Sequence, residues 1–284
     1  MSGTLYLCAT PIGNLEDITY RVVRVLGEVD LIAAEDTRHT IKLLNHFEIK
    51  TPMTSYHEFN KYDKADYLVT KLLEGQNIAV VTDAGTPGIS DPGEILVQKA
   101  HEAGITITSL PGACACITAL TMSGRETRRF CFEAFLPSDK KERKLILEEL
   151  KEETRTIILY EAPHRLLKTV EELLEIVGDR KVTLCRELTK KHETAFLTTL
   201  SGILDYYKEN EPKGECVLVL EGANRDELIK KEQESFATMS FTEHVQYYLA
   251  LGEDKKSAMK LVAKDRGISK RDVYQKLLEE ENEE

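Results

Sequence analysis

The sequence lacks the features of a membrane or exported protein. No run of apolar residues is long enough to cross a membrane, and the chain does not open with a basic stretch followed by an apolar one. These absences exclude a transmembrane helix and a secretory signal of the usual kind. We therefore expect a soluble, cytoplasmic protein with no membrane partner.

Cysteine motifs for metal binding or redox chemistry are absent as well. The six cysteines form no Cys-x-x-Cys pair, and no His and Cys spacing suits zinc. Most of them fall on or near apolar strands or on a helix of small residues. The sequence therefore predicts buried free thiols in a reducing cytoplasm and no metal site.

Basic residues are outnumbered overall, 38 against 49 acidic ones, but they are concentrated in one segment. The formal net charge of −11 argues against a protein that coats nucleic acid without specificity. Between residues 255 and 276, however, eight basic residues face only two acidic ones. Such a segment is a candidate surface for docking on a nucleic-acid backbone. The alternative is a helical cap or dimerisation element with solvated charges, because Leu261, Val262, Ile268, Val273 and Leu277 could form a small core.

Alternating patterns predict an α/β protein of two domains and a tail. With 284 residues, of which 42% are hydrophobic, the chain can bury two cores. Strand and helix patterns alternate up to about residue 122, the polar segment 123–129 interrupts them, and a second alternating set follows. We predict an N-terminal α/β domain at 1–122, a C-terminal α/β domain at 123–224, and a charged linker with a helical tail at 225–284.

Short helices are expected in the tail at residues 242–249, 257–265 and 270–278. Gly267 would form the turn and Ser269 would cap the following helix, as in a helix-turn-helix.

The most informative segment is residues 82–93, a loop rich in glycine and proline that contains Asp83 and Asp91. An apolar strand precedes it and a helix follows, so it lies at the carboxyl end of a parallel strand, where open α/β sheets bind ligands. Its glycine spacing does not match the dinucleotide fingerprint, and no Walker A lysine follows. An ordinary strand-to-helix connection is the alternative, but two carboxylates favour a ligand.

Similar loops follow the predicted strands at residues 4–9 and 105–110. Residues 10–19 and 111–116 are rich in Gly, Pro or other small residues, which permit close approach to the backbone. The three loops together predict one cleft.

Six motifs along nearly the whole chain make a more specific pattern. In order, they are Thr10-Pro11-Ile12-Gly13-Asn14, Ala34-Glu35-Asp36-Thr37-Arg38, His57-Glu58-Phe59-Asn60, the loop 83–93, Pro111-Gly112 and Glu161-Ala162-Pro163-His164-Arg165. This combination resembles the ribosomal RNA methyltransferase branch of the tetrapyrrole methylase family. Ala113 departs from the pattern, since many members have a second proline there.

The resemblance implies a two-domain fold with the cofactor cleft between the domains, and a homodimer. It also implies transfer of a methyl group from S-adenosylmethionine to the ribose 2′-OH of a cytidine in the decoding region of 16S rRNA. Such a pocket needs close walls that exclude water from the sulfonium cation. The implied cofactor residues are Pro11, Asp83, Gly85, Thr86, Cys114, Ala115, Tyr160, Ala162 and Gly214.

The acceptor hydroxyl is a poor nucleophile, so it requires positioning and help in losing its proton. The predicted catalytic set lies beside strand ends and comprises Asp36, Arg38, His57, Glu58 and Glu187. The predicted RNA contacts are Asn14, Asn60, Arg165, Lys190, Lys264, Lys270 and Arg271. Structural alternatives remain open: Asp36 capping a helix, His57 satisfied in a loop, Arg165 paired with glutamate, and Asn14 and Asn60 capping turns.

Two other functions compete with RNA methylation. One is methylation of a tetrapyrrole-like small molecule, which leaves the basic tail unexplained. The other is a regulator that senses a ligand and binds nucleic acid, which leaves the residues around Asp36 and His57 unexplained. Whether naked 16S rRNA or the assembled small subunit is the substrate stays open.

Overall fold

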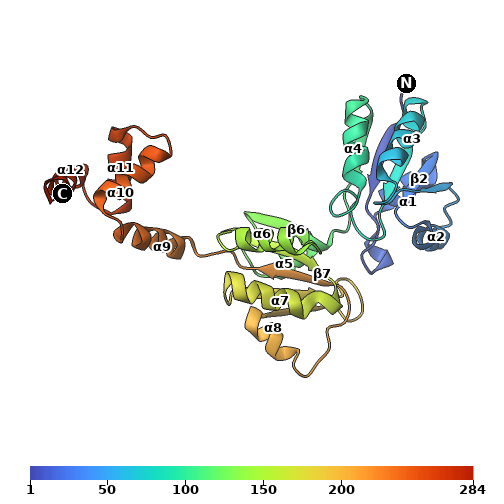
Figure 1. Cartoon of the computed structure of the whole chain (residues 1–284). Helices are drawn as coiled ribbons and strands as arrows, with labels where there is room; N and C mark the ends of the chain where they lie inside the picture. The colour runs from blue at the N-terminus through green and yellow to red at the C-terminus, as the bar shows by residue number, and fades with distance from the viewer. Residues whose placement is uncertain (284) are drawn as a thin grey trace. The chain divides into compact units, whose positions relative to one another are not determined.

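A computed structural model of the protein describes residues 1–283. The chain divides into two compact units, the first formed by residues 1–151 and 155–221 and the second by residues 152–154 and 222–284. The first unit contains two sheets, and the second unit is helical. Figure 1 shows the helices of the second unit in orange and red.

The first sheet is entirely parallel, with strand order β3-β2-β4-β1-β5. Its strands are β1 (Thr4–Cys8), β2 (Leu31–Ala34), β3 (Met53–Ser55), β4 (Ile78–Val81) and β5 (Thr106–Leu110). The connecting helices are α1 (Tyr20–Glu28), α2 (Thr37–His46), α3 (Lys61–Leu73) and α4 (Gly93–Glu102), and a 3-10 turn, η1 (Leu15–Asp17), precedes α1.

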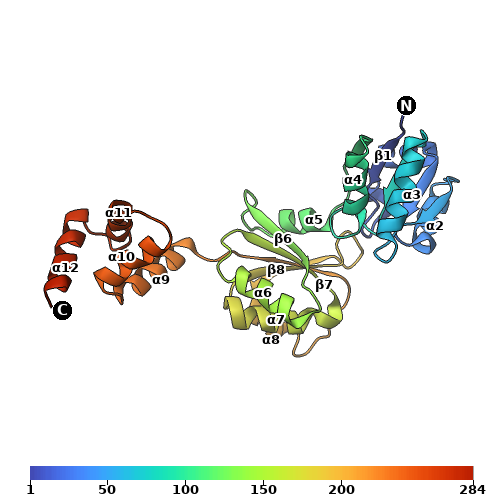
Figure 2. The same ribbon diagram turned by 45° about the horizontal axis from the view of Figure 1, so that its top comes forward.

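Helices cover both faces of this sheet. The apolar residues of α3 and α4 pack with Leu5, Ile78 and Val80 on one face, while those of α1 and α2 pack with Ala79 and Val81 on the other. Figure 2 shows α3 and α4 in front of the strands, with α2 farther back. Residues 78–81 are apolar on both sides of the strand, and each side packs against a layer of helices.

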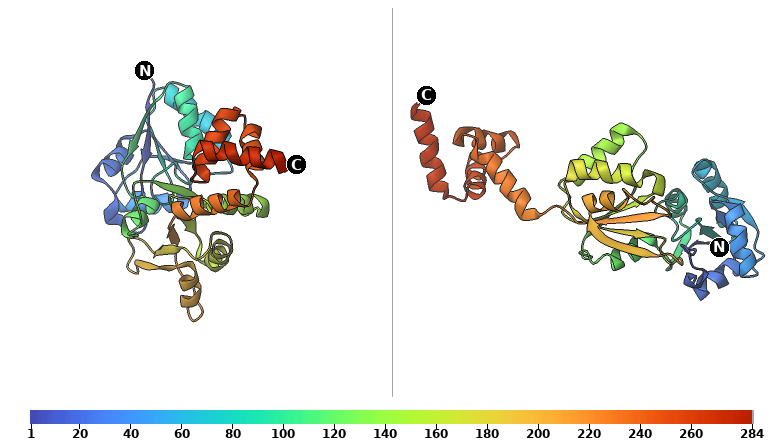
Figure 3. Two further views of the ribbon diagram at one scale, coloured as in Figure 1. Left: turned by 90° about the vertical axis from the view of Figure 1, so that its left-hand side faces the viewer. Right: turned by 90° about the horizontal axis from the view of Figure 1, so that it is seen from below.

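The second sheet is mixed, with strand order β6-β7-β10-β8-β9. Only β6 and β7 run parallel, and the other neighbours are antiparallel. Its strands are β6 (Phe130–Phe135), β7 (Thr156–Glu161), β8 (Lys181–Arg186), β9 (Thr194–Thr199) and β10 (Cys216–Leu220). Helices α6 (Lys140–Leu150), α7 (Pro163–Val177) and α8 (Leu200–Tyr206) cover one face. Figure 3 (right) shows these strands beside α6 and α7.

Helix α5 (Ala115–Met122) covers the opposite face of the second sheet. Its residues Cys116, Ala119 and Leu120 pack with Ile158 and Val217 of that sheet. The sequence pattern groups this helix with the first strand-helix set, because alternation continues through residue 122. In the structure α5 follows β5 of the first sheet yet packs against the second one, so it ties the two sheets together.

The second unit is built from helices. These are α9 (Arg225–Ala237), α10 (Phe241–Ala250), α11 (Lys255–Asp265) and α12 (Lys270–Glu283). The last three helices share a core that includes Val245, Met259, Val262 and Val273. The predicted cap at Ser269 is present, because its hydroxyl accepts the N–H of Asp272 at 3.2 Å and its own N–H donates to the Asp272 carboxylate.

Two features of the chain differ from the sequence expectation. Residues 225–237 form helix α9, although their charge suggested a linker; Asn224 caps this helix by accepting the N–H of Asp226. The strand ends expected beside Asp36 and His57 are those of β2 and β3. Strand β9 was not anticipated, since its apolar residues alternate with polar ones and it gains stability by pairing with β8. The domain limits at residues 122 and 224 themselves stay a prediction.

Candidate active site

A cavity of about 460 Å³ lies where loops from both sheets meet. From the first sheet it is lined by residues that follow β1, β2 and β4, and by the start of α5. From the second sheet it is lined by the end of β7 and by residues near β6, β8 and β10. The lining residues are Ile12, Glu35, Thr82, Asp83, Ala84, Gly85, Thr86, Ile89, Ser90, Asp91, Cys114, Ala115, Phe135, Tyr160, Glu161, Ala162, Pro163, Leu188, Glu215 and Val217.

The loop after β4 has a conformation that depends on glycine. Gly85 and Gly88 have φ of +88° and +82°, a region that other residues adopt only with strain. Gly85 also forms two backbone hydrogen bonds with Thr10, with N–O distances of 2.9 and 3.1 Å. The Asp91 carboxylate then accepts the N–H groups of Gly88 and Gly93 at 2.7 and 2.9 Å. The loop is therefore fixed before any ligand arrives.

Glu35, at the end of β2, holds the start of this loop. Its carboxylate accepts the Thr82 hydroxyl at 2.5 Å and the Asp83 N–H at 3.2 Å. The Asp83 carboxylate in turn accepts the backbone N–H of Asp36 at 3.2 Å. These bonds connect the ends of β2 and β4, which are neighbours in the sheet.

The second sheet supplies a wall around Tyr160 and Glu161. The Tyr160 hydroxyl accepts the N–H of Cys116 at 2.9 Å, which fixes the first turn of α5 at the cavity. Glu161 is buried, and its carboxylate accepts the Thr169 hydroxyl and the Ala162 N–H. Phe135 and Phe132 pack edge-on against the Tyr160 ring and complete an aromatic side of the cleft.

The electrostatics of the cavity are acidic. Burial raises the pKa of Asp83, and the nearby Glu35 carboxylate raises it further. Burial also raises the pKa of Asp91, against the opposing effect of its two backbone donors. A carboxylate that is costly to keep ionised favours a cationic ligand, because the ligand's charge offsets the lost hydration.

The structure brings most of the predicted cofactor residues together. Asp83, Gly85, Thr86, Cys114, Ala115, Tyr160 and Ala162 all line the cavity. Pro11 lines an adjoining hollow instead. Gly214 is next to Glu215, which does line the cavity, and its φ of +77° sets the path of the chain there.

Asp36 and Arg38 form a local pair at the start of α2. The Asp36 carboxylate accepts the Arg38 N–H and two guanidinium N–H groups, at 2.8, 3.1 and 2.7 Å. Hydrogen bonds from Arg38 hold the pKa of Asp36 well below its usual range. Asp36 therefore caps the helix, as the structural alternative suggested, while the side chain of Arg38 is 89% exposed.

His57 and Asn60 form a turn after β3. Asn60 accepts the His57 N–H at 2.9 Å, so it stabilises the turn. The Asn60 amide nitrogen also lies 3.4 Å from His57 Nε2. His57 Nδ1 is buried and has no hydrogen-bond partner among the described residues. Glu58, by contrast, is exposed and pairs with Lys61 at 2.6 Å.

Glu187 and Lys190 are also engaged with each other. Lys190 contacts the carboxylates of Glu187 at 3.0 Å and Glu215 at 3.2 Å. The hydrogen bond from Lys190 lowers the pKa of Glu187. Glu187 has φ of +50°, so this turn is strained for a residue other than glycine.

The remaining predicted RNA contacts are spread over both units. Arg165 pairs with buried Glu161 at 3.4 Å, as its structural alternative proposed. Asn14 caps η1 by accepting the Glu16 N–H. In the second unit, Lys264 and Arg271 are exposed and Lys270 is half-buried.

Glu35, Asp91 and Glu161 were not assigned roles from the sequence, although each falls within a quoted motif. The available signal was their position directly after an apolar strand or in the glycine-rich loop. Phe135 and Leu188 carried no such signal, because an apolar residue near a strand end usually belongs to the core.

Comparison with known proteins assigns this arrangement to a family. Residues 4–204 match the model of the Tetrapyrrole (Corrin/Porphyrin) Methylases. The chain is 50% identical to ribosomal RNA small subunit methyltransferase I of Halalkalibacterium halodurans, over 96% of this chain and 93% of the relative. It is 48% identical to the enzyme of the same name from Synechocystis sp., over 98% of both chains.

Among solved structures, uroporphyrin-III C-methyl transferase from Thermus thermophilus, complexed with S-adenyl homocysteine, superimposes with a TM-score of 0.56. That comparison covers 77% of this chain and 97% of the other at 15% identity, so it supports the fold alone. The sequence matches are much stronger and extend over nearly the full chain. The protein is thus a member of the tetrapyrrole methylase family, in the branch of the ribosomal RNA small subunit methyltransferases I.

Proposed function

We propose that this protein transfers a methyl group from S-adenosylmethionine to the ribose 2′-OH of a cytidine in the decoding region of 16S rRNA. The observation that carries the proposal is the 460 Å³ cavity built from the family's motifs. Its size is within the range of small-molecule sites, about 300–1,000 Å³. Its acidic lining suits a cofactor that has a sulfonium and an ammonium group. The full-length identity to named rRNA methyltransferases supports RNA as the acceptor.

The residues of the cavity fit S-adenosylmethionine. The loop 82–93 and the start of α5 form the polar side of the cavity, while Ile12, Leu188 and Val217 supply apolar walls. When bound, the cofactor supplies the electrophilic methyl group. The chain's own part is to orient the two substrates and to exclude water from the cleft.

Within the predicted catalytic set, we assign His57 to proton removal from the hydroxyl. It follows β3 at the same edge of the sheet as the loops after β2 and β4, and histidine is the side chain most often used as a general base. Asp36 is a poor base because Arg38 stabilises its ionised form. We therefore assign Asp36 to holding Arg38, whose exposed guanidinium can contact a phosphate.

Glu58 and Glu187 would then support the site through their pairs with Lys61 and Lys190. Asn14, Asn60 and Arg165 are likewise assigned to shaping the surface that faces the RNA.

We further propose that the second unit docks on the RNA backbone through Lys264, Lys270 and Arg271. The helices of this unit have their own core, so the charges need not support its fold. One basic residue is an exception: Arg266 donates to the carbonyl oxygens of Phe236, Met239 and Ser240, so it is structural. We also propose a cytoplasmic homodimer, to be tested by analytical ultracentrifugation. Within residues 1–283, no helix has the length and apolarity needed to span a membrane.

A methyl-transfer assay tests the activity. The protein is incubated with labelled S-adenosylmethionine and, separately, assembled small subunits, naked 16S rRNA and a corrin precursor. We expect label in RNA, at a cytidine 2′-O position by mass spectrometry of nucleosides. Label in the corrin precursor alone would show a small-molecule methyltransferase, and binding of cofactor without transfer to any acceptor would favour a ligand-sensing regulator.

Truncation tests the role of the second unit. Because β10 ends at Leu220 and the first unit extends to residue 221, the chain should be ended after Glu221. We expect unchanged cofactor affinity, weaker RNA binding and a shallower dependence on salt, since fewer phosphates are contacted. An unchanged Michaelis constant for RNA at every salt concentration would refute the docking role.

A further inference from the structure

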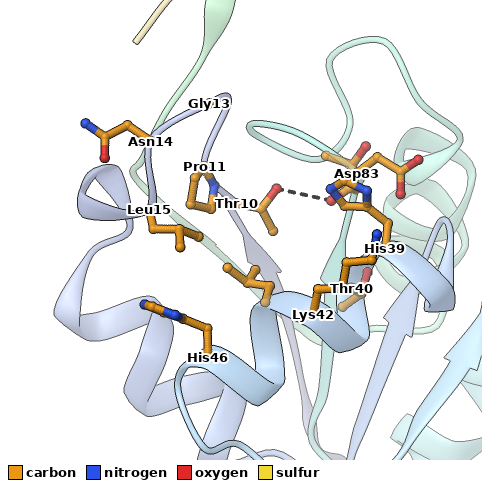
Figure 4. Close-up of a pocket in the computed structure, with 12 residues that line it drawn as sticks. Thr10, Pro11, Gly13, Asn14, Leu15, His39, Thr40, Lys42, His46 and Asp83 are labelled. Atoms are coloured by element: carbon orange, nitrogen blue, oxygen red, sulfur yellow. Dashed lines mark hydrogen bonds between the residues drawn. The ribbon is translucent and has the colours of Figure 1, made fainter. Parts of the chain in front are cut away.

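A second hollow, of about 310 Å³, adjoins the cofactor cavity on the first sheet. It lies between the loop after β1 and helix α2, as Figure 4 shows. Its lining residues are Thr10, Pro11, Gly13, Asn14, Leu15, His39, Thr40, Lys42, Leu43, His46, Thr82 and Asp83. Most of them have no role in the site described above.

One wall of the hollow is basic. His39, Lys42 and His46 are spaced three and four residues apart on α2, so they lie on one side of the helix. All three are exposed. In the described part of the chain, Lys42 and His46 make no hydrogen bond or ion pair, whereas many other exposed lysines, such as Lys208, pair with a nearby carboxylate.

The opposite wall is short and partly apolar. Pro11 and Leu15 lie on the loop after β1, and Leu15 is 43% exposed. The Asn14 side chain fixes this loop through its bond to the Glu16 N–H. Figure 4 shows Pro11 and Leu15 on the side of the hollow opposite Lys42 and His46. A planar or sugar group can rest on this wall while an anionic group meets the basic one.

The hollow and the cofactor cavity share the residues Thr82 and Asp83. The Thr10 hydroxyl donates to the Thr82 carbonyl at 3.1 Å, which holds the shared wall in place (Figure 4). Burial and Glu35 raise the pKa of Asp83, and His39 is close enough to oppose this rise. A linear ligand with one unit in the cofactor cavity can therefore place its neighbouring unit in the hollow.

We propose that this hollow binds one nucleotide of the RNA next to the methylated one, with its phosphate on Lys42 and His46. Its ribose or base would lie against Pro11 and Leu15. The inference rests on the proposed function and names where the RNA runs. The difference in lining favours RNA over part of the cofactor, because the cofactor cavity has the carboxylates Glu35, Asp91 and Glu161 beside Asp83, whereas the hollow has Lys42 and two imidazoles beside Asp83.

The test is charge reversal in the full-length protein. Lys42→Glu places a negative charge in the hollow, and Lys50→Glu makes the same change at an exposed residue outside it. For Lys42→Glu we expect the Michaelis constant for RNA to rise about tenfold at low salt, or about 1.4 kcal/mol. The slope of log affinity against log salt should also become shallower by about 0.7, the value for one phosphate contact on a single strand. Lys50→Glu should change neither quantity.

A second variant tests the shape of the hollow without changing its charge. Leu15→Trp would fill the space in front of the basic wall, and the partial exposure of Leu15 makes the change compatible with folding. We expect a higher Michaelis constant for RNA and unchanged affinity for S-adenosylmethionine. Wild-type values for both Lys42→Glu and Leu15→Trp would overturn the proposal.

The outcomes also separate this inference from the proposed function. If the wild-type protein methylates no RNA, the proposed function itself fails. If the wild type is active and Lys42→Glu matches Lys50→Glu, only the nucleotide site is wrong. If Lys42→Glu weakens S-adenosylmethionine binding measured without RNA, the hollow belongs to the cofactor and the proposal is also wrong.

Discussion

The two sheets of the first unit contribute to the cavity in different ways. The first sheet is parallel, so the loops that follow β1, β2 and β4 all emerge at the same edge. The second sheet is mixed, and it reaches the cavity at the end of β7 and at the start of its antiparallel neighbour β10. A parallel sheet gathers several loops at one edge, whereas this mixed sheet presents mainly a wall.

The two sheets therefore contribute different kinds of group to the cavity. The loops of the first sheet have fixed backbone turns and carboxylates, exemplified by Gly85 and Asp83. The second sheet contributes rigid or buried groups such as Tyr160 and Glu161. We therefore expect substitutions in the first sheet's loops to affect ligand binding more than substitutions in the wall.

The largest effect is expected for Gly85→Val. Its φ of +88° disfavours a branched residue, and an added Cβ would lie 3.3 Å from Ile12 and 3.4 Å from the Ala113 carbonyl oxygen. We expect S-adenosylmethionine affinity, measured by calorimetry, to fall about 100-fold, or about 2.8 kcal/mol. Gly104→Val is the matched control, since Gly104 also has a positive φ but open space around it. Equal losses in both variants would indicate general strain rather than a blocked site.

The next effect concerns His57, at the end of β3 in the same sheet. His57→Ala should lower the rate of methyl transfer about 100-fold, the lower end for loss of a general base. Cofactor affinity should stay within about twofold, because the residue acts on the acceptor. His101→Ala, at an exposed position on α4, serves as the control. A parallel fall in rate and cofactor affinity would make His57 a support of the cofactor site instead.

A smaller effect is expected from the wall. Tyr160→Phe removes the acceptor of the Cys116 N–H and leaves the aromatic packing with Phe132 in place. One lost hydrogen bond should weaken cofactor binding about 2- to 10-fold. Tyr206→Phe on α8, a partly exposed residue away from the cavity, should have no such effect. A loss as large as that of Gly85→Val would contradict the contrast between loops and wall.

The smallest effect lies outside both sheets, in the second unit. Burial lowers the pKa of His244 from its usual value of 6.5, with Arg266 adding to the effect. As pH falls below 6.5, His244 is protonated in the unfolded chain before it is protonated in the folded one. The free energy of unfolding of this unit is therefore highest above pH 6.5 and decreases as pH falls toward the pKa of His244 in the folded state. Hydrogen exchange should show faster opening of residues 240–280 below that pH, with little change in the sheets. His244→Gln should weaken this dependence; an unchanged one would assign it to another group.

Several site residues were predictable because the signal is local. The loop 82–93 has glycines where its backbone takes a positive φ, and such positions are visible in a sequence. The cap at Asp36 and the cap at Ser269 follow from side chains that bond the backbone two or three residues away. In the same way, short runs rich in apolar or β-branched residues predicted β1, β4 and β5.

Other features could not be predicted because they depend on distant neighbours. Strand β9 contains several threonines, and it exists through pairing with β8. The position of α5 on the second sheet depends on packing with Ile158 and Val217. The basic wall of the second hollow was missed because three basic residues on a helix usually mark a solvated face.

The sequence by itself determined the alternation of strands and helices, the fixed turns of the binding loops, the family and the charge of the tail. These properties depend on residues within a few positions of one another or on the order of motifs. Only the tertiary structure decided that Glu35 holds the loop after β4, that Tyr160 holds the start of α5, and that His39, Lys42 and His46 face Pro11 and Leu15. Each of these contacts joins residues that are brought together by the order of strands in a sheet or by the packing of a helix, which local sequence does not encode.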